Sequence, residues 1–262
     1  MRLLRCCCVL LFSFTTLATQ AKMVHRPVEW TDGGIRFHSV LVYDEAVTAK
    51  RPGLVMVPNW YGINDQAIRK AEMIAGKQYV VLLTDMYGRD VRPTDDDAAK
   101  AAVQPLYADR ALMRHRINTA LAQLKAQAGT APLDVGKLAA IGFCFGGSAV
   151  LDLARSGADV AAVVSFHGAL EAGKPALPDH FKARVLVMNG ADDRGTMPDA
   201  DAFMDEMRAS DADWQFVVLG NAVHCFTETG ENSTGCKYDA RAAARSYRMM
   251  QDWLDAAFAH RP

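Results

Sequence analysis

The stretch Leu138-Ala139-Ala140-Ile141-Gly142-Phe143-Cys144-Phe145-Gly146-Gly147-Ser148 decides the fold of this chain. Four apolar residues typical of a buried strand run into a cysteine that has a glycine two residues before it and another two residues after it. This order predicts a sharp strand-to-helix turn with Cys144 at its tip, in the place more often held by a serine nucleophile. Glycines are expected on both sides because larger side chains would collide across such a turn.

Outward from this turn, short apolar runs alternate with amphipathic stretches, which predicts an α/β fold with a mostly parallel central sheet and helices on both faces. The predicted strands are residues 53–57, 79–83, 138–141, 160–164, 185–188 and 214–219, and residues 35–43 are expected to start the sheet as an antiparallel edge. The predicted helices are residues 65–75, 109–126, 148–154, 199–209 and 240–258. The acidic run Asp95-Asp96-Asp97 predicts the start of a helix rather than a metal site.

Composition and charge narrow the class of protein. Half of the 262 residues are hydrophobic, and 29 Lys and Arg nearly balance 30 Asp and Glu. Such a chain can build a large core, and it has no strong field to attract nucleic acid or an anionic membrane. We therefore expect one globular domain with a small-molecule partner.

The N-terminus has the plan of a secretory signal peptide. Arg2 and Arg5 precede an apolar run, and small and polar residues follow up to Ala21. The apolar run is shorter than the roughly 20 residues that span a bilayer. We expect residues 1–21 to be a signal peptide, residues 22–262 to form the single domain, and the protein to be exported, periplasmic or secreted.

Removal of this leader takes three of the six cysteines with it and leaves Cys144, Cys225 and Cys236. Export implies an oxidising compartment, in which a Cys225–Cys236 disulfide is a hypothesis because the two are close in sequence. Cys144 would then be unpaired. The chain has no Cys-x-x-Cys motif, and His224 with Cys225 and Cys236 gives one ligand too few for a metal site, so we expect neither a metal nor a cofactor.

The order of residues after Cys144 predicts a catalytic triad. In an α/β-hydrolase the nucleophile is followed along the chain by an acid and then a histidine, each after a later strand. Asp192 and Asp193 follow the strand predicted at 185–188, and His224 follows that at 214–219. Either aspartate would orient His224, which would take the proton of the Cys144 thiol.

Two further roles follow from the turn and its surroundings. A helix beginning just after Cys144 would favour the thiolate, and the backbone N–H of Phe145 would point at a developing oxyanion. His167, after the strand predicted at 160–164, is expected to pack in the core, with a place in the site as the alternative.

The sequence resembles the dienelactone hydrolase family over most of the chain from about Arg51 to Phe258. Four segments carry the resemblance: Val57-Pro58-Asn59-Trp60-Tyr61-Gly62, Thr84-Asp85-Met86-Tyr87-Gly88-Arg89, the Gly142 to Gly147 turn, and Asp213-Trp214-Gln215 with Ala222-Val223-His224-Cys225-Phe226. The resemblance implies an α/β-hydrolase that opens esters or lactones through a thioester. It implies Cys144 as nucleophile, Asp193 as acid with Asp192 as the alternative, and His224 as base. It also implies a second oxyanion donor, the backbone N–H of Trp60.

Two positions depart from the family pattern. Asn59 stands where the family has a glutamate that interacts with the thiol, and Glu228 stands at the second of two arginines that bind a substrate carboxylate, whereas Arg89 matches the first. We therefore expect Asn59 and Arg89 to contact substrate, and the substrate to be a neutral or differently charged ester, thioester or lactone. The alternatives are a broad carboxylesterase and a catalytically silent binding protein on the same scaffold.

Overall fold

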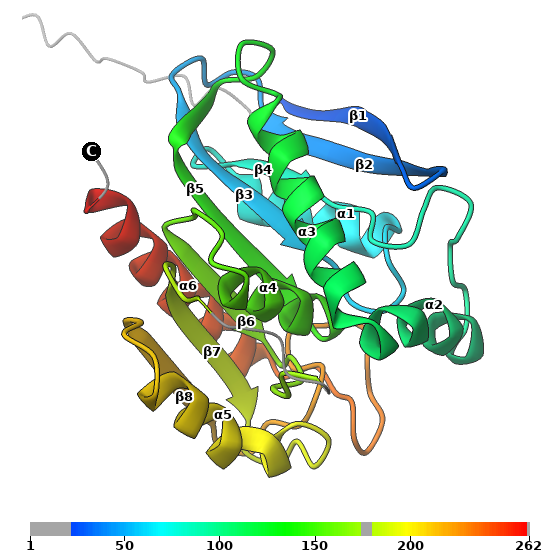
Figure 1. Cartoon of the computed structure of the whole chain (residues 1–262), viewed down its shortest axis with the longest axis vertical. Helices are drawn as coiled ribbons and strands as arrows, with labels where there is room; N and C mark the ends of the chain where they lie inside the picture. The colour runs from blue at the N-terminus through cyan, green and yellow to red at the C-terminus, as the bar shows by residue number, and fades with distance from the viewer. Residues whose placement is uncertain (1–21, 174–179, 261–262) are drawn as a thin grey trace, which may run out of the picture.

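The computed structural model describes residues 22–173 and 180–260, so the predicted signal peptide lies outside the described residues. Eight strands form one sheet in the order β1-β2-β4-β3-β5-β6-β7-β8 (Figure 1). The β2 strand pairs antiparallel with both β1 and β4, and all other neighbouring strands pair parallel. The strands are β1 Met23–Asp32, β2 Ile35–Asp44, β3 Arg51–Val57, β4 Val80–Leu83, β5 Leu133–Phe143, β6 Ala162–Phe166, β7 Arg184–Gly190 and β8 Trp214–Leu219.

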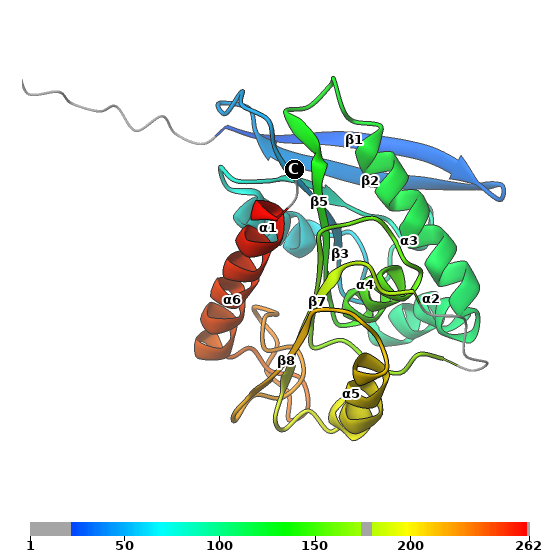
Figure 2. The same ribbon diagram turned by 60° about the vertical axis from the view of Figure 1, so that its left-hand side comes forward.

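Helices cover both faces of this sheet, as the alternating pattern predicted (Figure 2). They are α1 Asp65–Ala75, α2 Asp96–Ala108, α3 Arg110–Lys125, α4 Phe145–Arg155, α5 Ala200–Arg208 and α6 Ala240–Ala259, with a short 3-10 helix, η1 Met197–Asp199, before α5. Apolar side chains of α2 to α5 pack on one face in one buried cluster, and those of α1 and α6 pack on the other face in a second. The central strands are buried on both faces, which explains their unbroken apolar runs.

The antiparallel edge differs from the prediction. Residues 35–44 are antiparallel, but they form the second strand, and β1 occupies the edge beyond them. Of the ten residues of β1 only Val28 is buried, and Pro27 interrupts the pattern, which an edge strand tolerates because one side of it makes no ladder. Gly33 and Gly34 have φ of 56° and 79° and close the two-residue hairpin turn that a Gly-Gly pair favours.

The acidic run predicted to begin a helix does so. Asp95 is the N-cap of α2, its side chain accepting a hydrogen bond from the N–H of Ala98, and Asp96 and Asp97 lie in the first turn, where the helix dipole favours negative charge. The helix then continues through Pro105, a residue that breaks the expected helical pattern and hid its full extent in the sequence.

Candidate active site

The strand-to-helix turn has the geometry that its glycines predicted. Cys144 lies between β5 and α4 with φ of 54° and ψ of −117°, a left-handed conformation that a residue with a side chain adopts only under strain. A Cβ atom on Gly146 would lie 2.1 Å from the carbonyl oxygen of Val57 in the adjacent strand. The turn therefore requires a glycine here, and it holds the Cys144 side chain at the carboxyl end of the sheet.

Cys144, His224 and Asp193 form a continuous hydrogen-bonded chain. His224 Nε2 lies 3.2 Å from the Cys144 sulfur, and His224 Nδ1 lies 2.7 Å from Asp193 Oδ2. Asp193 is buried, whereas Asp192 is exposed, so the geometry chooses Asp193 between the two aspartates. The Thr196 hydroxyl donates to Asp193 Oδ2 at 2.7 Å, and the Gly195 N–H donates to Oδ1 at 3.0 Å, which fixes the orientation of the carboxylate.

The electrostatics of this chain favour a charged histidine. Burial lowers the pKa of His224, but its hydrogen bonds to Asp193 and Cys144 outweigh burial and raise that pKa to about 10. Burial alone would raise the pKa of Asp193, and the His224 and Thr196 hydrogen bonds hold it below its usual value instead. A histidine whose pKa is raised in this way can hold a proton and give it up to a neighbouring group.

Of the two predicted oxyanion donors, Phe145 directly follows Cys144 and Trp60 lines the same cavity. Phe145 is the first residue of α4, so its backbone N–H has no acceptor inside the helix. Trp60 follows β3 and lines the same cavity as Cys144. The Asn59 side-chain oxygen accepts from the N–H of Tyr61 at 3.1 Å, and the Tyr87 hydroxyl donates to the carbonyl of Trp60 at 3.0 Å, so the loop that carries Trp60 is fixed from both sides.

Cys144, Asp193 and His224 line a cavity of about 960 Å³, large enough for a small-molecule ligand. Aromatic side chains of Trp60, Tyr61 and Tyr107 line part of it. Carboxylates of Asp96, Asp192, Asp193, Glu228 and Glu231 also line it, against the single guanidinium of Arg194 among its described lining residues. The cavity wall is therefore acidic overall.

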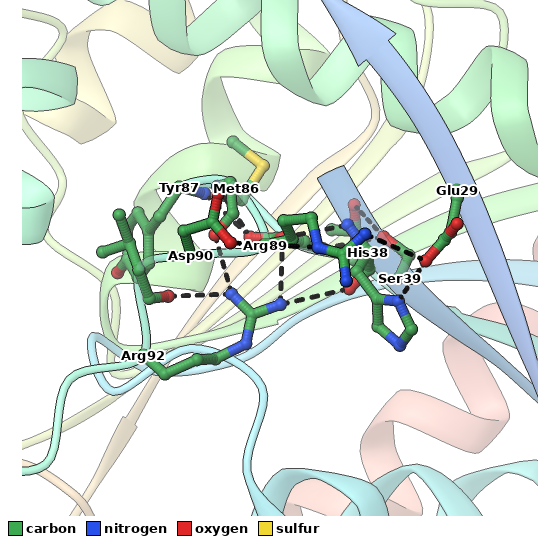
Figure 3. A network of polar contacts seen from close by, with 12 residues as sticks. Glu29, His38, Ser39, Met86, Tyr87, Arg89, Asp90 and Arg92 are labelled. Atoms are coloured by element: carbon green, nitrogen blue, oxygen red, sulfur yellow. Dashed lines mark hydrogen bonds and ion pairs between the residues drawn. The ribbon is translucent and has the colours of Figure 1, made fainter. Parts of the chain in front are cut away.

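Arg89 is not brought to this cavity. Its guanidinium lies 3.8 Å from Glu29 of β1 and 3.9 Å from Asp90, beside the antiparallel edge of the sheet (Figure 3). Arg89 is absent from the described residues that line the cavity. The loop before it is tied down by Asp85, whose carboxylate pairs with Arg92 at 3.1 Å. The sequence analysis did not predict that this loop lies beside β1, because it did not predict β1 itself.

Sequence reasoning also missed a buried ion pair next to the site. Lys70 of α1 and Glu228 have side chains only 10% and 4% exposed, and the Lys70 ammonium contacts the Glu228 carboxylate. The Asn59 amide donates to the same carboxylate at 2.9 Å. Asn59 thus binds protein groups through both ends of its amide, and Glu228 is neutralised rather than free to repel a substrate.

His167 packs in the core, as the sequence reasoning favoured, and it also contacts the triad. It is fully buried, its ring meets that of His224 edge to face at 5.0 Å between centroids, and its Nε2 lies 2.7 Å from the Thr227 hydroxyl. Burial, together with the positive charges of His224 and Lys70, holds the pKa of His167 well below its ordinary value. His167 is therefore neutral.

Cys225 and Cys236 form a disulfide, the pairing hypothesised from the sequence, with their Cα atoms 4.9 Å apart. Cys144 is the free thiol among the described residues. The loop that the disulfide closes begins directly after His224 and supplies part of the cavity wall, and the Lys237 N–H donates to the carbonyl of His224 at 2.9 Å. The disulfide therefore ties down the segment that carries the histidine.

Within the described ranges, no group of three His, Cys, Asp or Glu side chains is arranged to hold a metal ion, and no helix combines the length and apolarity needed to cross a membrane.

Comparisons with known proteins agree with this architecture. The solved structure of m3DLH is 38% identical and superposes with a TM-score of 0.83 over 90% of this chain and 99% of its own. A dienelactone hydrolase-like promiscuous phosphotriesterase, P91 from metagenomic libraries, is 39% identical, with a TM-score of 0.79 over 91% of this chain and all of its own. The uncharacterised Caenorhabditis elegans protein K02A2.1 is 38% identical over 156 residues, 56% of this chain and 95% of its own length. The model of the dienelactone hydrolase family matches residues 37–258, and the chain therefore belongs to this family of ester and lactone hydrolases.

Proposed function

We propose that this protein is an exported cysteine-dependent hydrolase of small esters or lactones, in which Cys144, His224 and Asp193 form the catalytic triad. The observation that carries the proposal is the unbroken chain from Asp193 through His224 to the Cys144 sulfur, with distances of 2.7 and 3.2 Å. A nucleophile within reach of a base that a third group orients is the arrangement that covalent catalysis requires.

In the acylation step the Cys144 sulfur attacks the carbonyl carbon of the substrate. The carbonyl oxygen becomes an oxyanion, which the backbone N–H groups of Phe145 and Trp60 stabilise. The C–O bond to the leaving group then breaks, and the His224 imidazolium gives its proton to the departing oxygen. In a lactone this oxygen stays attached to the acyl chain, so the ring opens and the whole molecule remains as a thioester.

Deacylation reverses these roles. Neutral His224 takes a proton from water, the resulting hydroxide attacks the thioester carbon, and the thiolate leaves. The proton remains on His224 and restores the starting state. Asp193 keeps the imidazole in the required tautomer through both steps.

The negative charge of the cavity wall favours a substrate whose acyl group is uncharged. Arg89, the residue expected to hold a substrate carboxylate, lies outside the cavity, and the acidic lining disfavours an anion there. Aryl phosphotriesters are a second substrate class to test, because the 39% identical protein P91 is described as a promiscuous phosphotriesterase. Export agrees with the disulfide, since disulfides persist in oxidising compartments.

Steady-state hydrolysis of short acyl esters, lactones and an aryl phosphotriester by residues 22–262 tests this proposal. Turnover should be lost in Cys144→Ala and after alkylation of Cys144, while the thermal transition stays unchanged. Unchanged turnover in Cys144→Ala would refute the nucleophile assignment. Ready alkylation without turnover of any substrate class would favour a binding protein on this scaffold, and comparable rates on all acyl esters without a lactone preference would favour a broad carboxylesterase.

A further inference from the structure

The loop that carries the Trp60 donor and the loop that carries His224 come from distant parts of the chain. The first follows β3 and the second follows β8, and these strands are separated by β5, β6 and β7 in the sheet. Catalysis by the proposed triad needs the two loops in a fixed relation, because a displacement of about 1 Å can cost on the order of 100-fold in rate.

One side-chain hydrogen bond joins these loops directly. Glu228 lies four residues after His224, and its Oε2 accepts from Asn59 Nδ2 at 2.9 Å, across 169 residues of sequence. On the other side, Asn59 Oδ1 accepts from the backbone N–H of Tyr61, and the Asn59 carbonyl accepts from the N–H of Gly62 at 2.9 Å. The turn formed by these two bonds contains Trp60. Residues 59–62 form the oxyanion loop, which carries the Trp60 N–H, and Glu228 contacts the residue that shapes it.

The Glu228 carboxylate is itself held by partners on other segments. Its Oε1 accepts from the Lys70 ammonium of α1 and from the Thr227 hydroxyl at 3.2 Å. Lys70 is fixed in turn, because its ammonium lies 4.1 Å from the ring centroid of Phe143, the residue before Cys144. A buried carboxylate with donors on both oxygens has one orientation, whereas an exposed one would sample several.

We propose that Glu228, clamped by Lys70, is a positioning residue that holds the oxyanion loop against the triad through its hydrogen bond to Asn59. This inference rests on the proposed function. Neither Glu228 nor Lys70 transfers a proton or touches the reacting carbonyl. The ion pair serves as a neutral, immobile acceptor for Asn59, and its contribution is realised when the oxyanion forms.

Two matched double variants separate the hydrogen bond from the charge. Lys70→Met with Glu228→Gln removes both charges but leaves an acceptor for Asn59, whereas Lys70→Met with Glu228→Leu removes both charges and the acceptor. Replacing both partners of a buried pair avoids the uncompensated charge that a single change leaves. Asn59→Ala breaks the same link, together with the bond from the Tyr61 N–H, while the ion pair stays intact. Glu72→Gln, which changes an α1 carboxylate that bonds His25 instead of Glu228, is the control.

Two readouts distinguish positioning from a general loss of structure. Steady-state ester hydrolysis depends on the oxyanion loop, whereas alkylation of Cys144 by iodoacetamide forms no oxyanion and reports only on the thiol and His224. We expect the Leu double variant and Asn59→Ala to lose about 10- to 100-fold in kcat, less than or similar to removal of an oxyanion donor. Their KM and alkylation rates should stay within about threefold of wild type, and the Gln double variant should keep kcat within about fivefold.

Equal kcat in the Gln and Leu double variants would overturn the inference, as would parallel loss of alkylation and turnover. Asn59→Ala with wild-type kcat would overturn it independently of how the double variants fold. Cys144→Ala separates this failure from that of the proposed function: if it abolishes turnover while Asn59→Ala has no effect, only the positioning role is wrong. Persistent turnover in Cys144→Ala would remove the basis of both.

Discussion

Gly142→Ala tests the requirement for glycine at the turn before Cys144. A Cβ atom on residue 142 would lie 2.0 Å from the carbonyl oxygen of Gly146 and 2.8 Å from the nitrogen of Gly147. Both are backbone atoms in the first turn of α4, so no side-chain rotation relieves the contact. Because real Cβ contacts do not fall below 3.0 Å, β5 and the start of α4 must separate by about 1 Å. This displacement acts directly on Cys144, which lies between them.

The expected loss follows from that displacement. A shift of about 1 Å in a reacting group costs on the order of 100-fold in kcat/KM. Overpacking of a well-packed site costs about 1–3 kcal/mol of stability, and a domain of this size loses about 2–4 °C of Tm for each kcal/mol. We therefore expect Gly142→Ala to lower Tm by about 2–12 °C and ester hydrolysis by about 100-fold.

The control for this experiment is Gly220→Ala, since a Cβ atom there has no neighbour within 4 Å and needs no unusual backbone conformation. Its Tm and turnover should match wild type. Differential scanning calorimetry and initial rates on one short acyl ester measure both quantities. If Gly142→Ala keeps turnover within threefold and the Tm of Gly220→Ala, the steric argument for the turn is wrong.

Three further predictions concern the surroundings of the triad. Asp193→Asn removes the carboxylate charge that helps to raise the pKa of His224 to about 10, so the alkaline limb of the pH profile of kcat/KM should move from near pH 10 towards neutral pH; a limb that stays in place would contradict the cause assigned to that pKa. Reduction of Cys225–Cys236 should cost about 2–4 kcal/mol in the free energy of unfolding measured in urea, as expected for a short closed loop, and should lower turnover because the loop follows His224 directly; equal stability before and after reduction would argue against it. Arg89→Ala should change KM for a carboxylate-bearing lactone less than twofold, since its guanidinium lies near Glu29; a large rise in KM would mean that Arg89 reaches the substrate after all.

The juxtaposition of Cys144, Asp193 and His224 could be predicted from the sequence because each residue follows a strand with a clear apolar pattern. Parallel strands deliver their carboxyl ends to one edge, so the order of Cys144, Asp193 and His224 along the chain implied their meeting in space. The local sequence pattern does not show which of the adjacent residues Asp192 and Asp193 bonds to His224. It depends on the turn after β7, which buries the second and exposes the first.

The unpredicted parts depend on contacts between distant segments. Lys70 occupies a helical position that reads as a solvent-exposed cation, and its burial depends on Glu228, 158 residues away. The burial of the edge strand β1 does alternate, but the strand escaped notice because Arg26 and Asp32 occupy two of its five inward positions and Pro27 interrupts it. The local sequence shows the residue types, whereas the burial of these positions depends on which distant segment covers them.

The position of Glu228 changes the reason for expecting an uncharged substrate. In the sequence alone Glu228 stood as a bare carboxylate where an arginine was expected, and its repulsion argued against an anion. The structure pairs it with Lys70, so this pair contributes little net field to the cavity. The expectation rests instead on Asp96, Asp192 and Glu231. These three carboxylates line the cavity without an ion pair among the described residues, and Arg194 is the one guanidinium that lines it with them. Three such carboxylates facing one guanidinium leave an excess of negative charge in the cavity wall, and that excess disfavours an anionic lactone whether or not Glu228 is charged.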